Sequence, residues 1–154
     1  MTDAVLIVYA PSVVPPPQLA RFAAEVARVG AGALRLPAAD ASWLDAARAA
    51  VSAATDLVVL DPGGGPRELL LGDRPIAELQ AAGDHAALVV GGPGVTALLA
   101  GLAAGSHLRA GSADSPGDGS VKHEVQLVAR AAALSRLAGR VPMNPSEARA
   151  HLNR

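Results

Sequence analysis

The chain has 154 residues, a formal net charge of −1, no cysteine, and aromatic side chains at only 2% of positions. This length predicts one α/β domain over residues 1–154, whereas a complete eight-stranded (β/α) barrel usually needs about 250 residues. The missing cysteines exclude disulfides and thiolate metal sites, and the near-neutral charge gives no indication of nucleic acid or an anionic membrane as a partner.

The start of the chain predicts neither a signal peptide nor a membrane span. The apolar run from Val5 to Ala10 is short, and no cluster of basic residues precedes it. We therefore expect a cytoplasmic protein. Its core has to be built from Ala, Val and Leu, whose small side chains bury little area each, so we expect modest stability or support from oligomerisation.

Short apolar runs alternate with helical patterns along the whole chain. The runs are typical of strands buried on both faces, and they cover residues 5–8, 33–36, 56–60, 86–90 and 107–110. Helices are expected after the Pro11–Pro17 segment up to Gly30, after Ser42, from Pro75 to Ala82, from Gly94 to about Ala104, from Val121 to Ala138, and after Asn144. The segment between Pro66 and Pro75 is expected to be less regular.

Turn and cap residues mark several of these boundaries. Ser42 is the expected cap of the second helix, and Asp40 is expected to cap or border it. Asn144 and Glu147 stand at the N-cap and N3 positions of a final short helix.

Strands that alternate with helices are parallel, which makes the chain an α/β protein built from β/α units. Five strands are too few to close the usual barrel, so we expect a truncated, barrel-like open sheet. A flavodoxin-like three-layer sandwich is the alternative. An open half-barrel exposes strand edges and apolar surface, which pairing with another chain would cover.

The segment Gly105–Asp114 resembles the last barrel strand of the β-keto acid cleavage enzymes, the family of 3-keto-5-aminohexanoate cleavage proteins. That family reads roughly Gly-Gly-His-Val-Arg-Val-Gly-Leu-Glu-Asp at this point. The resemblance continues through a Leu-Val-x-x-Ala helix at Leu127–Ala131, a Gly-Arg stop at Gly139–Arg140, and a Pro-x-Glu-Ala-Arg helix at Pro145–Arg149. It covers residues 88–154, and a looser match over residues 4–65 precedes it in the correct order.

The resemblance implies an acetyl-CoA-dependent cleavage of β-keto acids, in which a zinc ion polarises the keto group. It places the family's two zinc-binding histidines on Arg35 and Pro37, and its zinc-binding glutamate on Ala113. Because these side chains offer no metal donor and His107 is a single remaining imidazole, we expect no zinc site and no other metal or cofactor. Acetyl-CoA remains an expected ligand.

Arg109 and Asp114 correspond to the family's Arg and Asp of the proton-transfer machinery, and are the expected catalytic residues. Read on their own, they are equally well a structural ion pair that steadies the last loop. The functional interpretation is that Arg109 and Asp114 belong to a pocket that binds a carboxylate. Arg35, at the position of a zinc ligand of the family, would add positive charge to this pocket, since arginine binds carboxylates through two hydrogen bonds. His107 is a further candidate for substrate binding, with a satisfied core histidine as the default.

Gly91, Gly92 and Gly94 precede a helix, where backbone N–H groups can cradle a phosphate. A tight turn is the commoner role of such glycines. Asp61–Gly65 resembles the family's Thr-Gly-Gly segment without its hydroxyl residue. We propose no nucleophile, because neither Ser112 nor Ser115 has a base at recognisable spacing.

Together these features predict a short, degenerate family member, zinc-free and catalytically inactive. It would bind a small carboxylate or acyl-CoA, or act as a partner subunit in a homo-oligomer or with a full-length paralogue. The alternative is an active β-keto acid cleavage enzyme (an acyl-CoA C-acyltransferase) that uses Arg35, Arg109 and Asp114 in place of zinc. A third hypothesis is a chain that folds without any remaining activity.

Overall fold

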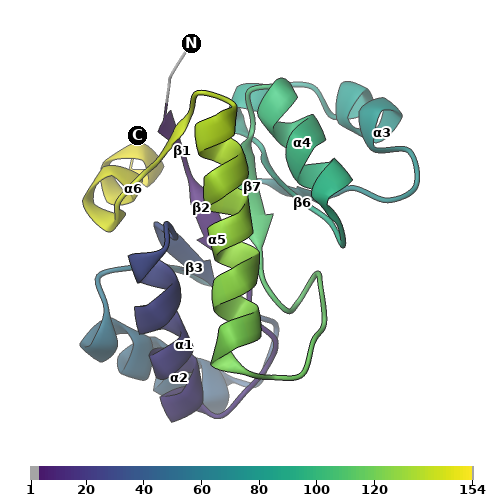
Figure 1. Ribbon diagram of the computed structural model, residues 1–154. Coiled ribbons are helices and arrows are strands. Elements are labelled where there is room, and N and C mark those ends of the chain that lie inside the picture. Colours follow the sequence, from purple (N-terminus) through teal and green to yellow (C-terminus); the bar gives the residue numbers. More distant parts are fainter. Residues whose placement is uncertain (1–3, 154) are drawn as a thin grey trace.

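A computed structural model describes residues 4–153 as parallel strands surrounded by helices (Figure 1). The strands are β1 Ala4–Val5, β2 Ile7–Tyr9, β3 Ala33–Arg35, β4 Val58–Leu60, β5 Glu68–Leu70, β6 Val89–Gly91, β7 His107–Ala110 and β8 Val141–Pro142. The helices are α1 Pro16–Arg28, α2 Ala41–Ala54, α3 Pro75–Ala82, α4 Val95–Ala103, α5 Val121–Leu137 and α6 Pro145–Leu152, with a short 3-10 turn at His85–Ala87.

The main sheet has the strand order of a barrel that has been opened along one line. Its six strands run β4-β3-β2-β7-β6-β5, and every pair is parallel. Within this sheet, strands that are consecutive in the chain pair with each other, except β4 and β5. The last of the six strands in the chain, β7, pairs with the first of the six, β2. In a flavodoxin-like sheet the first strand lies between the second and the third, so the expected truncated barrel-like architecture is confirmed.

The expectation of five strands is wrong, because β5 adds a sixth to the main sheet. This strand lies in the segment that was expected to be less regular. It is only three residues long and begins with a charged residue, Glu68, so it lacks the continuous apolar run of a buried parallel strand. A separate two-stranded pair, β1 with β8, joins the two ends of the chain.

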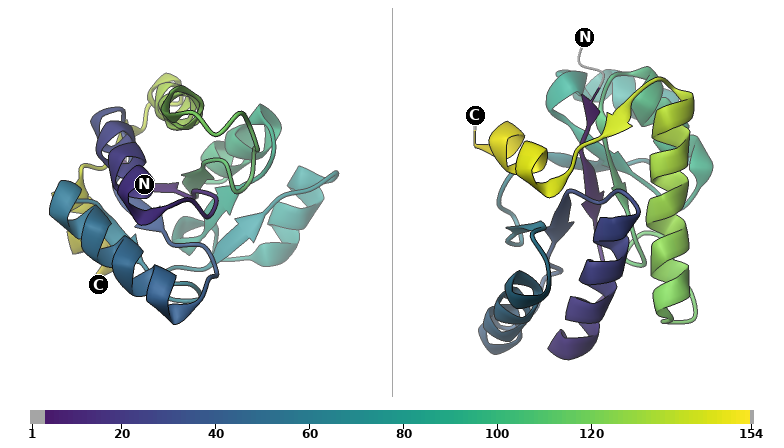
Figure 2. Two further views of the ribbon diagram at one scale, coloured as in Figure 1. Left: turned by 90° about the horizontal axis from the view of Figure 1, so that it is seen from below. Right: turned by 60° about the vertical axis from the view of Figure 1, so that its left-hand side comes forward.

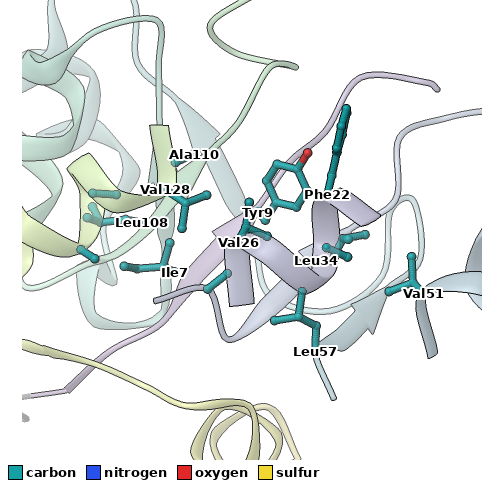
Figure 3. Packing of buried hydrophobic residues seen from close by; sticks show 14 of the residues in the cluster. Ile7, Tyr9, Phe22, Val26, Leu34, Val51, Leu57, Leu108, Ala110 and Val128 are labelled. Carbon is teal, nitrogen blue, oxygen red and sulfur yellow. The ribbon is translucent and has the colours of Figure 1, made fainter. Parts of the chain in front are cut away.

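Side chains on alternate positions of the strands face two different layers. Ile7, Leu34 and Leu108 face outward, where they pack against residues of α1, α2, α4 and α5 in the larger core (Figure 3). Because successive strand residues point to opposite faces, Leu6, Val8 and other small apolar residues face inward. Viewed along the strands, the helices form an arc around them (Figure 2).

Helix α6 lies across the end of the sheet at which the strands begin (Figure 2). The Asn144 side chain accepts a hydrogen bond from the Glu147 backbone N–H, and the Glu147 carboxylate accepts one from the Asn144 N–H, which is the expected capping box. Met143 and Ala148 join the inner apolar cluster. Helix α6 therefore covers part of the inner face at this end of the sheet.

The second helix begins two residues earlier than an N-cap at Ser42 would place it. Asp40 is its N-cap, and its Oδ1 accepts a hydrogen bond of 2.8 Å from the Trp43 N–H. Among residues 4–153, no helix combines the length and the apolar character needed to cross a membrane.

Candidate functional site

Four charged side chains meet on the inner face of the sheet, towards the carboxyl ends of the strands. Arg35 ends β3, Glu68 begins β5, Arg109 lies on β7, and Asp114 follows in the loop after β7. Their side chains are 10%, 11%, 16% and 3% exposed, respectively, so all four are largely removed from water. Charges at this depth are stable only when they are paired.

Arg109 and Asp114 form a two-pronged ion pair. The Arg109 Nε donates to Oδ2 of Asp114 at 2.8 Å, and its Nη2 donates to Oδ1 at 2.9 Å. Burial alone would lower the pKa of Arg109, but the hydrogen bonds and charges of Asp114 and Glu68 raise it overall. The guanidinium is therefore a permanent cation in this site.

The guanidinium of Arg35 is held by Glu68 and by backbone carbonyls of the loop after β4. Its Nε donates to Oε2 of Glu68, with which its Nη2 forms an ion pair, and its Nη1 donates to the backbone carbonyls of Asp61, at 2.5 Å, and Gly64. The Nη2 also lies 3.5 Å from the Pro66 carbonyl. The loop after β4 thus folds over the guanidinium and uses its remaining donors.

Glu68 joins the two arginines. Its Oε2 accepts from Arg35, and its Oε1 accepts from the Arg109 Nη1 at 2.9 Å. The cluster therefore holds two positive and two negative side chains, and its charges balance. Sequence reasoning missed Glu68 entirely. The apolar run that follows it, Leu69–Leu71, is too short to predict a strand with an inward-facing acid.

Two cavities open beside this cluster, and Arg35 and Arg109 line both of them. One, of about 370 Å³, is lined by Glu68 and the Gly63–Arg67 segment. The other, of about 350 Å³, is lined by a mostly apolar set that includes Pro37 and Ala113. The three positions to which the sequence resemblance assigns zinc ligands, Arg35, Pro37 and Ala113, therefore surround one space.

The side chains around that space do not fit a zinc ion. Zinc is held by nitrogen, oxygen or sulfur donors of His, Asp, Glu or Cys. Proline and alanine carry no such donor, and the Arg35 guanidinium is a cation whose N–H groups already donate elsewhere. Within residues 4–153, no group of three or more His, Cys, Asp or Glu residues is placed to hold a metal.

His107 lies at the end of the sheet that α6 partly covers. Its Nδ1 accepts a hydrogen bond of 2.9 Å from the Leu6 N–H, and its ring meets that of His151 on α6, with 4.6 Å between the ring centres. Burial, followed by the nearby His151 and Arg140, lowers the pKa of His107 to about 4. The geometry is that of a satisfied, neutral core histidine, and the ring lies among residues of α6 instead of the two cavities.

The candidate glycines differ in how closely they are packed. A Cβ on Gly91 would lie 3.1 Å from the Arg109 Cβ, so the missing side chain makes room for Arg109. A Cβ on Gly92 would lie 2.7 Å from the Ala97 Cβ. Gly94 is the N-cap of α4 and has open space around it. Close packing therefore explains why residues 91 and 92 are glycines, and no bound ligand is needed to account for them.

A second polar cluster lies on the outer side of the sheet. The Tyr9 hydroxyl donates to Oε1 of Glu124 at 2.7 Å, and the Ser112 hydroxyl donates to the same oxygen at 2.5 Å. The Ser12 hydroxyl and N–H both donate to the Ser112 Oγ at 3.0 Å. Glu124 is 2% exposed, and its Oε2 has no partner among the described residues. The sequence pattern gave no signal for this cluster, because its members come from three distant segments.

The fold and the sequence were compared with known proteins. The solved structure of (S)-3-O-geranylgeranylglyceryl phosphate synthase from Thermoplasma acidophilum, in complex with sn-glycerol-1-phosphate, matches with a TM-score of 0.56 and 13% identity. The match covers 83% of this chain and 92% of that one. At this identity the match supports a shared barrel-like fold alone. The comparison with curated proteins finds no match.

The model of the β-keto acid cleavage enzyme family matches residues 62–153, which is more than half of the chain. The matched part contains Glu68, Arg109, Ala113 and Asp114, and it leaves out Arg35. The chain therefore belongs to the β-keto acid cleavage enzyme family.

Proposed function

We propose that this chain is a zinc-free member of its family that does not cleave β-keto acids and instead binds a small carboxylate beside Arg109. The observation that carries the proposal is the cavity shared by Arg35, Pro37, Ala113 and Arg109. It holds a fixed guanidinium where the family resemblance places metal ligands.

The loss of cleavage activity follows from the chemistry of the cavity. A metal polarises a keto group by accepting electron density from its oxygen. The Arg35 guanidinium cannot take over this role, because Glu68 and the carbonyls of Asp61 and Gly64 already hold its N–H groups. Without a metal ion next to the substrate carbonyl, the site lacks the electrophile that the resemblance implies for the family reaction.

Carboxylate binding follows from the donors that Arg109 retains. A guanidinium carries N–H groups on Nε, Nη1 and Nη2, with two on each Nη. Within residues 4–153, Asp114 and Glu68 accept one hydrogen bond from each of these nitrogens. One N–H on Nη1 and one on Nη2 are thus left to a ligand, and Arg109 lines both cavities. These N–H groups favour a carboxylate over a neutral ligand.

The experiment is a thermal-shift titration with acetoacetate and, separately, with acetyl-CoA, alongside an assay for β-keto acid cleavage. We expect acetoacetate to raise the melting temperature, because a ligand that binds only the native state stabilises it. We expect no turnover. Arg109→Lys keeps the charge but loses the planar donor set, and should abolish the shift, whereas the exposed Arg21→Lys should leave it unchanged. Zinc-independent turnover at the rates of an enzyme, or an unchanged shift in Arg109→Lys, would refute the proposal.

A further inference from the structure

We infer that Glu68 acts as a built-in carboxylate ligand that occupies the position between Arg35 and Arg109, so that an external carboxylate reaches both arginines only by displacing it. This inference rests on the proposed function, and it adds how the same site is regulated and which anion fits it.

The contacts of Glu68 are those of a bound anion. One carboxylate oxygen accepts from Arg109 at 2.9 Å, and the other accepts from Nε of Arg35 and forms an ion pair with its Nη2. Two guanidinium groups therefore converge on one carboxylate from β3 and β7, the strands on either side of β2. Because an external monocarboxylate has the same shape and charge as the end of this side chain, it can make the same hydrogen bonds.

Glu68 also belongs to an edge strand of the main sheet. Among residues 4–153, β5 pairs with β6 alone. The side chain of Leu70, two residues on, is 53% exposed. Glu68 itself lines the cavity of about 370 Å³ that contains both arginines and the Gly63–Gly65 turn. A small shift of this edge would withdraw the carboxylate without breaking the central strands.

The first test is chemical rescue of Glu68→Ala. This substitution leaves two buried guanidinium groups facing a space the size of a carboxylate, and we expect the melting temperature to fall by roughly 5 °C or more. Acetate, which supplies the missing group, should restore at least half of this loss at concentrations that shift the wild type little. Chloride at the same ionic strength should not. Phosphate is tested in the same way. If phosphate restored the melting temperature as much as acetate does, the site would be a general anion site.

Glu25→Ala is the matched control, since this glutamate forms an exposed pair with Arg28, with side chains 43% and 76% exposed. Its melting temperature should respond to acetate as the wild type does. A Glu68→Ala protein that folds but gains no more from acetate than from chloride would overturn the inference.

Glu68→Gln keeps the shape of the side chain and removes its charge, which covers the case in which Glu68→Ala does not fold. We expect acetoacetate to bind this variant at least ten-fold more tightly than it binds the wild type, by calorimetry. Equal affinity, with binding still lost in Arg109→Lys, would refute the role of Glu68 and leave the proposed function intact. If acetoacetate bound to Glu68→Gln but not to the wild type, this result would refute the proposed function of the wild type and support the role of Glu68.

Discussion

Arg109 and Asp114 lie five positions apart in the sequence and face each other through two parallel hydrogen bonds, of 2.8 and 2.9 Å. The strand β7 aims the arginine inward, and the loop that follows turns back so that the aspartate meets it. The two side chains are 16% and 3% exposed, so the ion pair is largely shielded from water. Removing one partner from a buried pair leaves an uncompensated charge, which costs more than an exposed pair ever contributes.

We therefore expect Asp114→Asn to lower the free energy of unfolding by about 3 kcal/mol or more. Urea denaturation measures this loss. Asp45→Asn is the control, because Asp45 pairs with Arg48 on the surface, with side chains 79% and 41% exposed, and its loss should cost less than about 1 kcal/mol. Similar effects for the two variants would mean that the Arg109 pair is not a buried structural contact.

Acidification should destabilise the protein through His107. Burial lowers the pKa of His107 from 6.5, the ordinary value for a free histidine, to about 4 in the folded protein, so the unfolded chain binds more protons between these two pH values. The free energy of unfolding should therefore fall as the pH drops from 6.5 to 4. At about 1.4 kcal/mol per unit of pKa difference, the loss from this residue is at most about 3–4 kcal/mol.

The control for this pH dependence is His107→Asn, which keeps an acceptor for the Leu6 N–H but does not titrate. Denaturation curves at several pH values should show a shallower decline for the variant than for the wild type. An identical decline would assign the acid sensitivity to other groups.

Gly92→Ala should be costly and Gly94→Ala mild. The new Cβ at position 92 would lie 2.7 Å from the Ala97 Cβ and 2.9 Å from the Leu71 carbonyl oxygen, so the backbone has to move. We expect a loss of about 1–3 kcal/mol for this overpacking. At position 94 nothing lies within 4 Å, and exchanging the N-cap glycine should cost less than about 1 kcal/mol. Urea midpoints compare the two, and equal losses would contradict the packing role of Gly92.

Tyr9→Phe should destabilise the protein by about 1.5–3 kcal/mol, the range for a lost hydrogen bond to a charged group. The hydroxyl donates to a buried carboxylate whose other oxygen has no partner among residues 4–153. Since Ser112 donates to the same oxygen, a double-mutant cycle with Ser112→Ala should give a coupling energy of about 0.5 kcal/mol or more. Strict additivity would show that the two hydroxyls do not act on one group.

Much of the fold could be predicted because its elements have strong local signals. Pro75–Ala82 forms the expected helix with the expected bounds, and Asn144 with Glu147 forms the expected capping box. The strand β5 had no such signal, because three residues that begin with a glutamate look like a loop. Its place in the sheet is determined by pairing with β6, and this long-range contact leaves no local pattern.

The candidate site was predictable in part. Arg35, Arg109 and Asp114 were identified by their positions at strand ends and by the family resemblance, and the structure brings them together. Glu68 was missed with its strand, and without it the charge balance of the site could not be derived. His107 is two residues from Arg109 and shares its face of the sheet, but it lies beside α6 at the other end, where Leu6 and His151 surround it.

Native mass spectrometry of the purified protein, after incubation with zinc and removal of the excess, tests most directly the proposal that this cavity binds no zinc. Arg35, Pro37 and Ala113 line that cavity and supply no donor for the ion. The chain should therefore keep the mass of the bare polypeptide, and acetoacetate should stabilise it equally with and without zinc. One zinc ion retained per chain, and lost on a substitution in this cavity, would show that the family's metal chemistry persists here through other ligands.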